Sequence, residues 1–337
     1  MQVRKLLVIV TILTGIITSF SSCKRSSITL DYTNAEGEVP QLGNLIFRFN
    51  KSIVPDSLLN NWDSTEYVSF EPKIPGRFRW DGTDQLVFSP SRPLSPATNY
   101  TAKFKKDVLR YSAYDKVEVD DDVKFHTPSL QLTDAMVTWV LVDENSRSAV
   151  PNISLHFNYD VEPETIQDKL KIEVDGKQTN YSFQTLSASK EMILRLNEFK
   201  SEDKNYEAKV TLAEGVIPKG GANKTSEKLQ ALLVIPSPYV LNINDVQSEH
   251  DGTEGIVRIS TTQQLVNEEI SSLIKFEPAI KYTVEFNDFG LVLRSEKFSA
   301  EESYSMTISK GLRGRIGGVL KEDYYGSVAF GQLEASI

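Results

Sequence analysis

Short runs of alternating apolar and polar residues dominate the chain, as expected for strands with one buried face. Examples are LIFRFN, NISLHFN, MILRL and GLVLRS. Apolar residues at helical spacing are scarce. The sequence therefore predicts an all-β fold.

Three landmarks recur in the same order along the chain. The first landmark is a tyrosine at the start of an alternating run. The second is an apolar residue in an alternating run that precedes this tyrosine. The third, present in the first two repeats, is a proline at the end of the repeat. These residues are Tyr100, Tyr206 and Tyr304, then Phe49, Phe157 and Ile259, and finally Pro128 and Pro236. The spacing between copies stays between 98 and 108 residues. We predict three modules, at residues 28–128, 129–236 and 237–337, each of the size of an Ig-like β-sandwich.

The recurring tyrosines have a structural explanation. The segment LSPATNY, which ends at Tyr100, resembles the Leu-x-Pro-x-Thr-x-Tyr corner of fibronectin-type and other Ig-like sandwiches. In that corner the tyrosine hydroxyl bonds back to the main chain. Phe298 keeps the same six-residue spacing to Tyr304, and Phe199 precedes Tyr206 by seven residues. We expect all three tyrosines to be structural corner residues.

The N-terminus has the layout of a secretory signal. Arg4 and Lys5 precede an apolar stretch at residues 6–20, and two serines end immediately before Cys23. Basic, apolar and small-residue regions in this order mark a cleaved signal peptide. The apolar stretch is shorter than the roughly 20 residues that a spanning helix needs. We therefore predict a signal peptide at residues 1–22, cut between Ser22 and Cys23, with an uncleaved anchor as the alternative.

Cys23 is the only cysteine in the chain. A small-small-Cys ending resembles the lipobox of bacterial lipoproteins, although Phe20 stands where leucine is usual. The resemblance implies lipidation of Cys23 and a tether at residues 23–27. The alternative, a free thiol in an exported protein, would be exposed to oxidation. Lys24 in place of aspartate, and the lack of an acidic run after Cys23, favour the outer membrane, facing the periplasm.

Composition and motifs argue against several functions. Without residues 1–22 the chain has 35 basic and 46 acidic residues, a net charge of −11. An acidic chain without a basic stripe argues against nucleic-acid binding. His126, His156 and His250 show no metal-ligand spacing, and no Gly-x-Ser-x-Gly is present. We expect no enzymatic activity, no cofactor and no metal, and we expect a monomer.

Several other features bear on possible binding sites. The acidic run EVDDD at 118–122 is either a calcium site or a solvated strand end, which is favoured. The run KGLRGRIGGVL at 310–320 is a phosphate loop or, as favoured, a turn and loop. His250 lies in a segment typical of a loop. Trp80 and Trp139 lie in alternating runs and are predicted core residues, whereas Trp62 is either packed or an exposed platform for a sugar.

Residues 68–104 resemble the bacterial Ig-like domain of S-layer proteins and of the N-terminal region of bacterial alpha-2-macroglobulins. The match includes a Phe-x-Pro-x-x-x-Gly-x-x-x-Trp stretch, a strand ending in Phe-x-Pro and a Leu-x-x-x-Thr-x-Tyr corner. These residues are Phe70, Pro72, Gly76, Trp80, Phe88, Pro90, Leu94, Thr98 and Tyr100. The third module keeps only Phe276 and Pro278 of the stretch. A lipoprotein signal before such a domain extends the resemblance to nearly the whole chain.

The resemblance implies a function. Bacterial alpha-2-macroglobulins are periplasmic lipoproteins that trap proteases, many with a thioester from a Cys-x-Glu-Gln motif. This chain has no second cysteine for that thioester. The resemblance implies the non-catalytic, lipid-anchored N-terminal part of such an inhibitor, with proteases or another envelope protein as partners. A truncated frame, a fragment and a free-standing chain stay open. The alternative is an envelope binding or spacer lipoprotein that presents a surface for a partner or glycan.

Overall fold

The computed structural model describes residues 27–119, 122–143 and 148–330. Strands make up almost all of its regular structure. The helical elements in these ranges are three short turns: η1 (Asp56–Leu58), η2 (Lys106–Leu109) and α2 (Pro163–Ile166). The prediction of an all-β fold is confirmed. The chain divides into two compact units between Pro128 and Ser129.

The first unit is one β-sandwich, called here the first sandwich. One sheet has the order β5 (Gly76–Gly82), β6 (Gln85–Pro90), β3 (Leu45–Phe49), β1 (Ser27–Thr33) and β8 (Lys116–Glu118). The other has the order β2 (Gly37–Glu38), β9 (Val123–His126), β7 (Asn99–Phe104) and β4 (Val68–Glu71). Its core runs from Ile28 to Phe125 and is rich in aromatic rings.

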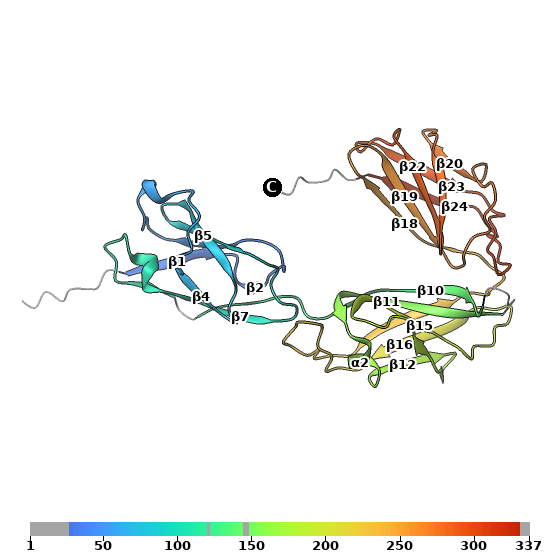
Figure 1. The fold of residues 1–337 in the computed structure, drawn as a ribbon, viewed down its shortest axis with the longest axis horizontal. Helices are drawn as coiled ribbons and strands as arrows, with labels where there is room; N and C mark the ends of the chain where they lie inside the picture. The colour runs from blue at the N-terminus through green and yellow to red at the C-terminus, as the bar shows by residue number, and fades with distance from the viewer. Residues whose placement is uncertain (1–26, 120–121, 144–147, 331–337) are drawn as a thin grey trace, which may run out of the picture. The chain divides into compact units, whose positions relative to one another are not determined.

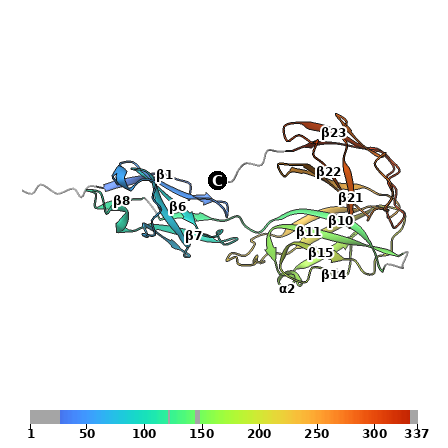
Figure 2. The same cartoon turned by 45° about the horizontal axis from the view of Figure 1, so that its top comes forward.

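The second unit begins with the second sandwich. One sheet has the order β10 (Leu132–Leu141), β11 (Ala149–Val161), β15 (Ser189–Arg195) and β14 (Ser182–Phe183). The other has the order β13 (Lys177–Gln178), β12 (Leu170–Val174), β16 (Tyr206–Leu212) and β17 (Leu229–Ile235). Figure 2 shows β10, β11, β15 and β14 lying side by side. The core between the sheets runs from Leu130 to Ile235.

The third sandwich completes the second unit. One sheet has the order β18 (Ile243–His250), β19 (Gly255–Thr261), β22 (Gly290–Ser295) and β21 (Thr283–Asn287). The other has the order β20 (Ile274–Glu277), β23 (Ser303–Ile308) and β24 (Tyr324–Ala329). Figure 1 shows β18, β19 and β22 in one layer of this sandwich. Its separate core runs from Leu241 to Phe330.

The three sandwiches share one strand order. In the first sheets, β6-β3-β1, β15-β11-β10 and β22-β19-β18 are equivalent neighbours. In the second sheets, β4-β7-β9, β12-β16-β17 and β20-β23-β24 are equivalent. The repeat landmarks fall at matching places: Phe49, Phe157 and Ile259 lie in the central strand of each first sheet. The repeated sequence pattern therefore corresponds to a repeated topology.

The alternation of residue types accounts for the strands. In β23 the side chains of Tyr304, Met306 and Ile308 are buried, and the residues between them are exposed or half-buried. In β16 the buried positions are Tyr206, Ala208 and every second residue after them. In these two strands one face therefore packs on a core while the other is directed toward solvent.

Candidate functional site at the junction of the second and third sandwiches

The residues of the predicted lipid anchor lie outside the described part of the chain. This holds for the signal peptide at 1–22, for the cleavage pair Ser22 and Cys23, and for the tether except Ser27, where β1 begins. Over the described ranges, no helix combines the length and the apolar character needed to cross a bilayer. Lipidation of Cys23 therefore stays a prediction.

The three repeat tyrosines make corner hydrogen bonds. The hydroxyl of Tyr100 accepts the backbone N–H of Ser95 at 2.9 Å, and that of Tyr304 accepts the N–H of Ser299 at 2.9 Å. The hydroxyl of Tyr206 accepts the N–H of Glu202 at 2.5 Å. All three side chains are buried. Each bond satisfies a backbone donor in the loop that leads into the strand of the tyrosine, so these tyrosines stabilise the fold.

Tyr304→Phe is expected to lower the free energy of unfolding of the third sandwich by about 1–2 kcal/mol, because it leaves the Ser299 N–H without its partner. Burial also raises the pKa of the Tyr304 hydroxyl, because it disfavours the ionised form. Hydrogen exchange followed by mass spectrometry in increasing urea measures the effect on peptides of β23. The matched control is Tyr325→Phe, at a side chain that is 73% exposed. Equal changes in the two variants would contradict a corner role.

Asp120 and Asp121 of the acidic run lie outside the described residues, so the interpretation of that run stays a prediction. Among the described residues, no group of three or more His, Cys, Asp and Glu side chains is placed to hold a metal ion. His156 lies 3.7 Å from a carboxylate oxygen of Glu191 on the neighbouring strand. The prediction that His250 lies in a loop is wrong: it is the last residue of β18, because the turn of this hairpin takes up only Asp251–Glu254. Its Nε2 lies 3.1 Å from the carbonyl oxygen of Phe298.

The three tryptophans have different environments. Trp80 and Trp139 are 2% and 1% exposed, so the prediction of core positions is confirmed. Trp62 is 44% exposed. The guanidinium carbon of Arg79 lies 4.6 Å from the centre of the Trp62 ring and covers one of its faces. That cation–π contact leaves less of the ring free for stacking on a sugar.

Trp139 belongs to the second core and also joins the second sandwich to the third. Its indole Nε1–H donates to the carbonyl of Pro236 at 3.0 Å. Its backbone N–H donates to the carbonyl of Thr262, at 2.6 Å, in the third sandwich. A further bond runs from the amide of Asn244 to the carbonyl of Val137 at 3.1 Å. β10 is therefore hydrogen-bonded both to the segment that leads into the third sandwich and to residues in β18 and directly after β19.

Gln263 lies at the centre of this junction and is completely buried. Its side-chain Nε2 donates to the carbonyl of Pro238 at 2.7 Å and more weakly to that of Val240 at 3.3 Å. Its Oε1 accepts the backbone N–H of Gly318 at 3.1 Å. All the hydrogen-bonding capacity of a buried amide needs partners, and here the partners are backbone groups.

The glycine-rich run at 310–320 is a turn and loop, as predicted, and it surrounds Gln263. A Cβ atom added at Gly314 would lie 2.3 Å from the Gln263 Oε1, and one added at Gly318 would lie 2.1 Å from the Nε2. Glycine is required at both positions because the amide fills the space that a side chain would take. The loop is therefore built around an internal side chain, which leaves no reason to assign it to phosphate.

The same loop extends the junction. Ile316 packs against the core of the second sandwich. The guanidinium of Arg315 donates to the side-chain oxygen of Gln264 at 2.8 Å. Arg313 donates to both carboxylate oxygens of Glu268, a bond that lowers the pKa of Glu268 and raises that of Arg313. Residues 129–337 are therefore one compact unit with two cores and a hydrogen-bonded connection between them.

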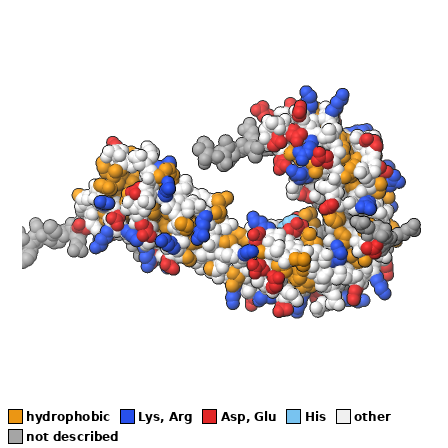
Figure 3. All heavy atoms as spheres, in the orientation of Figure 1, with side chains coloured by type: hydrophobic (Ala, Val, Ile, Leu, Met, Phe, Trp, Pro, Cys, Tyr) orange, Lys and Arg blue, Asp and Glu red, His pale blue; other side chains and the backbone are white. Residues whose placement is uncertain are grey.

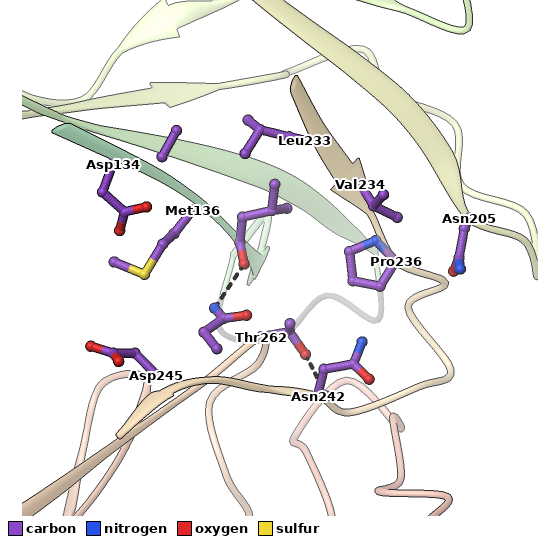
Figure 4. Close-up of a pocket in the computed structure, with 12 residues that line it drawn as sticks. Asp134, Met136, Asn205, Leu233, Val234, Pro236, Asn242, Asp245 and Thr262 are labelled. Carbon is purple, nitrogen blue, oxygen red and sulfur yellow. Dashed lines mark hydrogen bonds between the residues drawn. The ribbon is translucent and has the colours of Figure 1, made fainter. Parts of the chain in front are cut away.

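A pocket of about 470 Å³ lies beside the junction. Figure 4 shows Asp134 and Met136 of β10, Leu233 and Val234 of β17, and Asn242, Asp245 and Thr262 of the third sandwich around it. The carboxylates of Asp134 and Asp245 lie at one end, and Asn205 lies at the other. The pocket has an apolar side, amide groups and two acids, with no histidine, serine or cysteine in its lining.

The surface around the sandwiches is mixed in charge. On the face shown in Figure 3, basic and acidic side chains are interspersed. The ion pairs among described residues, such as Arg294 with Glu254 at 2.8 Å, are of this surface kind.

Comparison with known proteins finds a distant relative. The chain is similar to an alpha-2-macroglobulin of Pasteurella multocida (strain Pm70), with 18% identity over 273 residues. The match covers 76% of this chain and 14% of that protein, so the chain spans about a seventh of the relative's length. No protein-family model matches the sequence. The similarity supports a macroglobulin-like protein built of Ig-like sandwiches.

Solved structures with the same general fold include titin domains I67–I69 in an E-to-A variant. That structure is 7% identical, the match covers 89% of this chain and 97% of that one, and the TM-score is 0.19. The human desmocollin-1 ectodomain is 11% identical over 93% of this chain and 59% of that one, with a TM-score of 0.18. Because these superpositions are poor, the fold assignment rests on the strand order described above.

Sequence patterns located the corner tyrosines but not the junction. Gln263 and Thr262 lie in a run with no recognisable motif. A signal that could have located it is the concentration of glycines at 314–318, because glycine allows another group to approach the main chain closely. That group is 55 residues away in sequence.

Proposed function

We propose that this chain is the lipid-anchored, non-catalytic N-terminal part of a macroglobulin-like protein that inhibits proteases by trapping them. The observation that carries the proposal is the similarity to an alpha-2-macroglobulin over 273 residues. The serial sandwiches and the absence of a catalytic constellation in the described pocket linings agree with a scaffold role.

Each part of the chain has a task in this proposal. Cys23 attaches the protein to a membrane through acyl chains, each contributing about 0.8 kcal/mol per buried methylene group. The junction around Trp139 and Gln263 holds the second and third sandwiches together as one body. In this proposal the two sandwiches therefore move together when the rest of the inhibitor rearranges. Cys23 is the only cysteine, so any thioester would have to come from other sequence.

Trapping is tested on the complete gene product, purified from the membrane fraction and mixed with an endoprotease. We expect hydrolysis of a large substrate such as casein to fall while hydrolysis of a short peptide substrate continues. The reason is that an inhibitor enclosing the protease keeps only large substrates away from the protease active site. The control is Cys23→Ser, which should move the protein to the soluble fraction and leave trapping intact, since the lipid is no part of the trap. Unchanged hydrolysis of both substrates would contradict the inhibitor function.

The second candidate is an envelope binding or spacer lipoprotein. The pocket beside the junction favours it, because its apolar side and two carboxylates suit a ligand rather than a reaction. The same assay distinguishes the two candidates. A spacer lipoprotein leaves hydrolysis of both substrates unchanged, and its Cys23→Ser variant still moves to the soluble fraction.

A further inference from the structure

The last strand of the first sandwich is covered by a strand from the same chain. β2 pairs in parallel with β9, with Gly37 opposite Phe125 and Glu38 opposite His126. The backbone N–H of Val39 then donates to the carbonyl of His126 at 2.8 Å. Val39 itself is 4% exposed and belongs to the core. A short segment thus protects the edge of this sheet and adds an apolar side chain to the sandwich.

Within the described residues, no strand is hydrogen-bonded to the outer edge of the equivalent strand in the second sandwich, although β10 lies beside it. β17 corresponds to β9, because each pairs with the strand that begins at or beside a corner tyrosine. In the described residues, β17 is the last strand of its sheet and pairs only with β16. Every second residue along an antiparallel edge strand turns its N–H and C=O outward. The third sandwich differs at the equivalent edge, that of β24. There the hydroxyl of Ser248 in β18 donates to the carbonyl of Ala329 in β24, at 2.8 Å.

The residues of β17 offer none of the usual protection against strand addition. Exposed edges are normally short, charged or interrupted by proline. β17 is seven residues long, LQALLVI, without a charge or a proline. Leu232 is 80% exposed and Val234 is 57% exposed. By contrast, the edge strand β5 carries Arg77, Arg79 and Asp81.

Two grooves border this same edge. The pocket of about 470 Å³ lies between β17 and β10, with Leu233 and Val234 in its lining. A second groove, of about 430 Å³, lies over the neighbouring strands and is lined by Leu232 and Val234 together with Glu207 and Lys209. A strand that paired with β17 would place alternate side chains on opposite faces, and so into the two grooves.

The charges at the first groove select the partner. Asp134 and Asp245 lie at one end of it, and neither lysine nor arginine contributes to its lining (Figure 4). Asp245 accepts bonds from the Val246 N–H and the Gln247 amide, which keep its carboxylate in place. A basic side chain on the incoming segment would find two carboxylates without a competing cation.

We propose that β17 binds a short extended segment of another protein, apolar at alternate positions and carrying a lysine or arginine, which adds as a parallel strand where β2 lies in the first sandwich. The Asp134 and Asp245 carboxylates bind the basic side chain. This site stands independently of the inhibitor function, because it rests on the free edge, the two grooves and their charges.

The test uses the full chain and a fluorescent peptide of sequence RTVTVTVT. We expect saturable binding by fluorescence anisotropy. Leu232→Lys and Val234→Lys should each weaken binding by roughly tenfold or more, because a charge on the edge opposes strand addition. Gln230→Lys is the matched control: it adds the same charge to the same strand outside both grooves, and binding should persist. Asp134→Asn with Asp245→Asn should weaken binding of this peptide but not of a peptide with threonine in place of the arginine.

Several results would overturn the site. These are no binding of the arginine peptide to the wild-type chain, equal binding by Val234→Lys, or equal binding of a peptide with proline in place of its central valine, which cannot pair. Sedimentation velocity tests whether a second copy of this chain occupies the edge instead. A concentration-dependent dimer that Leu232→Lys abolishes would assign the edge to a second copy of this chain and overturn the peptide proposal.

Discussion

Trp139→Ala is expected to lower the free energy of unfolding of the second sandwich by about 3–5 kcal/mol, the range for removing a large buried aromatic side chain. Trp139 is 1% exposed and is among the largest fully buried side chains. Its ring also packs against Phe199 at a centroid distance of 5.9 Å. The substitution leaves a cavity in the second core and an unpaired carbonyl at Pro236, so the third sandwich should loosen as well.

Hydrogen exchange with mass spectrometry across a urea series measures this effect by region, which suits a chain of several cores. We expect faster exchange in peptides from β10, β17 and the residues around Thr262. The matched control is Trp80→Ala, an equally buried tryptophan in the first unit, which should leave exchange in 129–337 unchanged. If Trp139→Ala affected the second sandwich and left the third at its original exchange rates, the indole would play no part in the junction.

Gln263→Leu is the second substitution with a large expected effect. Leucine has a similar size, so packing changes little, but the Pro238 and Val240 carbonyls and the Gly318 N–H lose their partner. Each buried polar group left without a hydrogen bond costs about 1–3 kcal/mol, so we expect a loss of about 3 kcal/mol or more in the third sandwich.

The neighbouring Gln264→Leu is the control for this substitution. It removes only an exposed hydrogen bond with Arg315 and should change stability by less than about 1 kcal/mol. The same urea and exchange measurements apply, read on peptides of the loop at 310–320. Similar stability losses in the two variants would show that the lower polarity of this segment reduces stability, and not the loss of the hydrogen bonds of the buried Gln263 amide.

Local patterns in the sequence predicted the strands and the corner tyrosines because both depend on neighbouring residues. Alternating burial within β16 or β23 is set by a few consecutive side chains, and the Tyr304 hydroxyl bonds to a residue only five positions earlier. The fold class followed from these signals. His250 was misplaced because polar residues near a tight hairpin resemble a loop, although they continue the strand to the turn.

The junction was beyond such reasoning because its contacts join distant parts of the chain. The Trp139 indole meets a carbonyl 97 residues away, and Asn244 bonds to one 107 residues away. Trp139 was identified as a core residue, yet nothing near it in sequence indicated a second role. The open edge of β17 was equally hidden, because it depends on where β2 lies in one sandwich and on the lack of an equivalent strand in the other.

The packing of Gln263 between Gly314 and Gly318 has an evolutionary consequence. The amide occupies the volume that a side chain at either glycine would need, so these three positions share one space. A larger residue at 314 or 318 becomes acceptable only after position 263 has become smaller, and a smaller residue at 263 leaves backbone groups unpaired. Mutational paths through this junction therefore require paired changes.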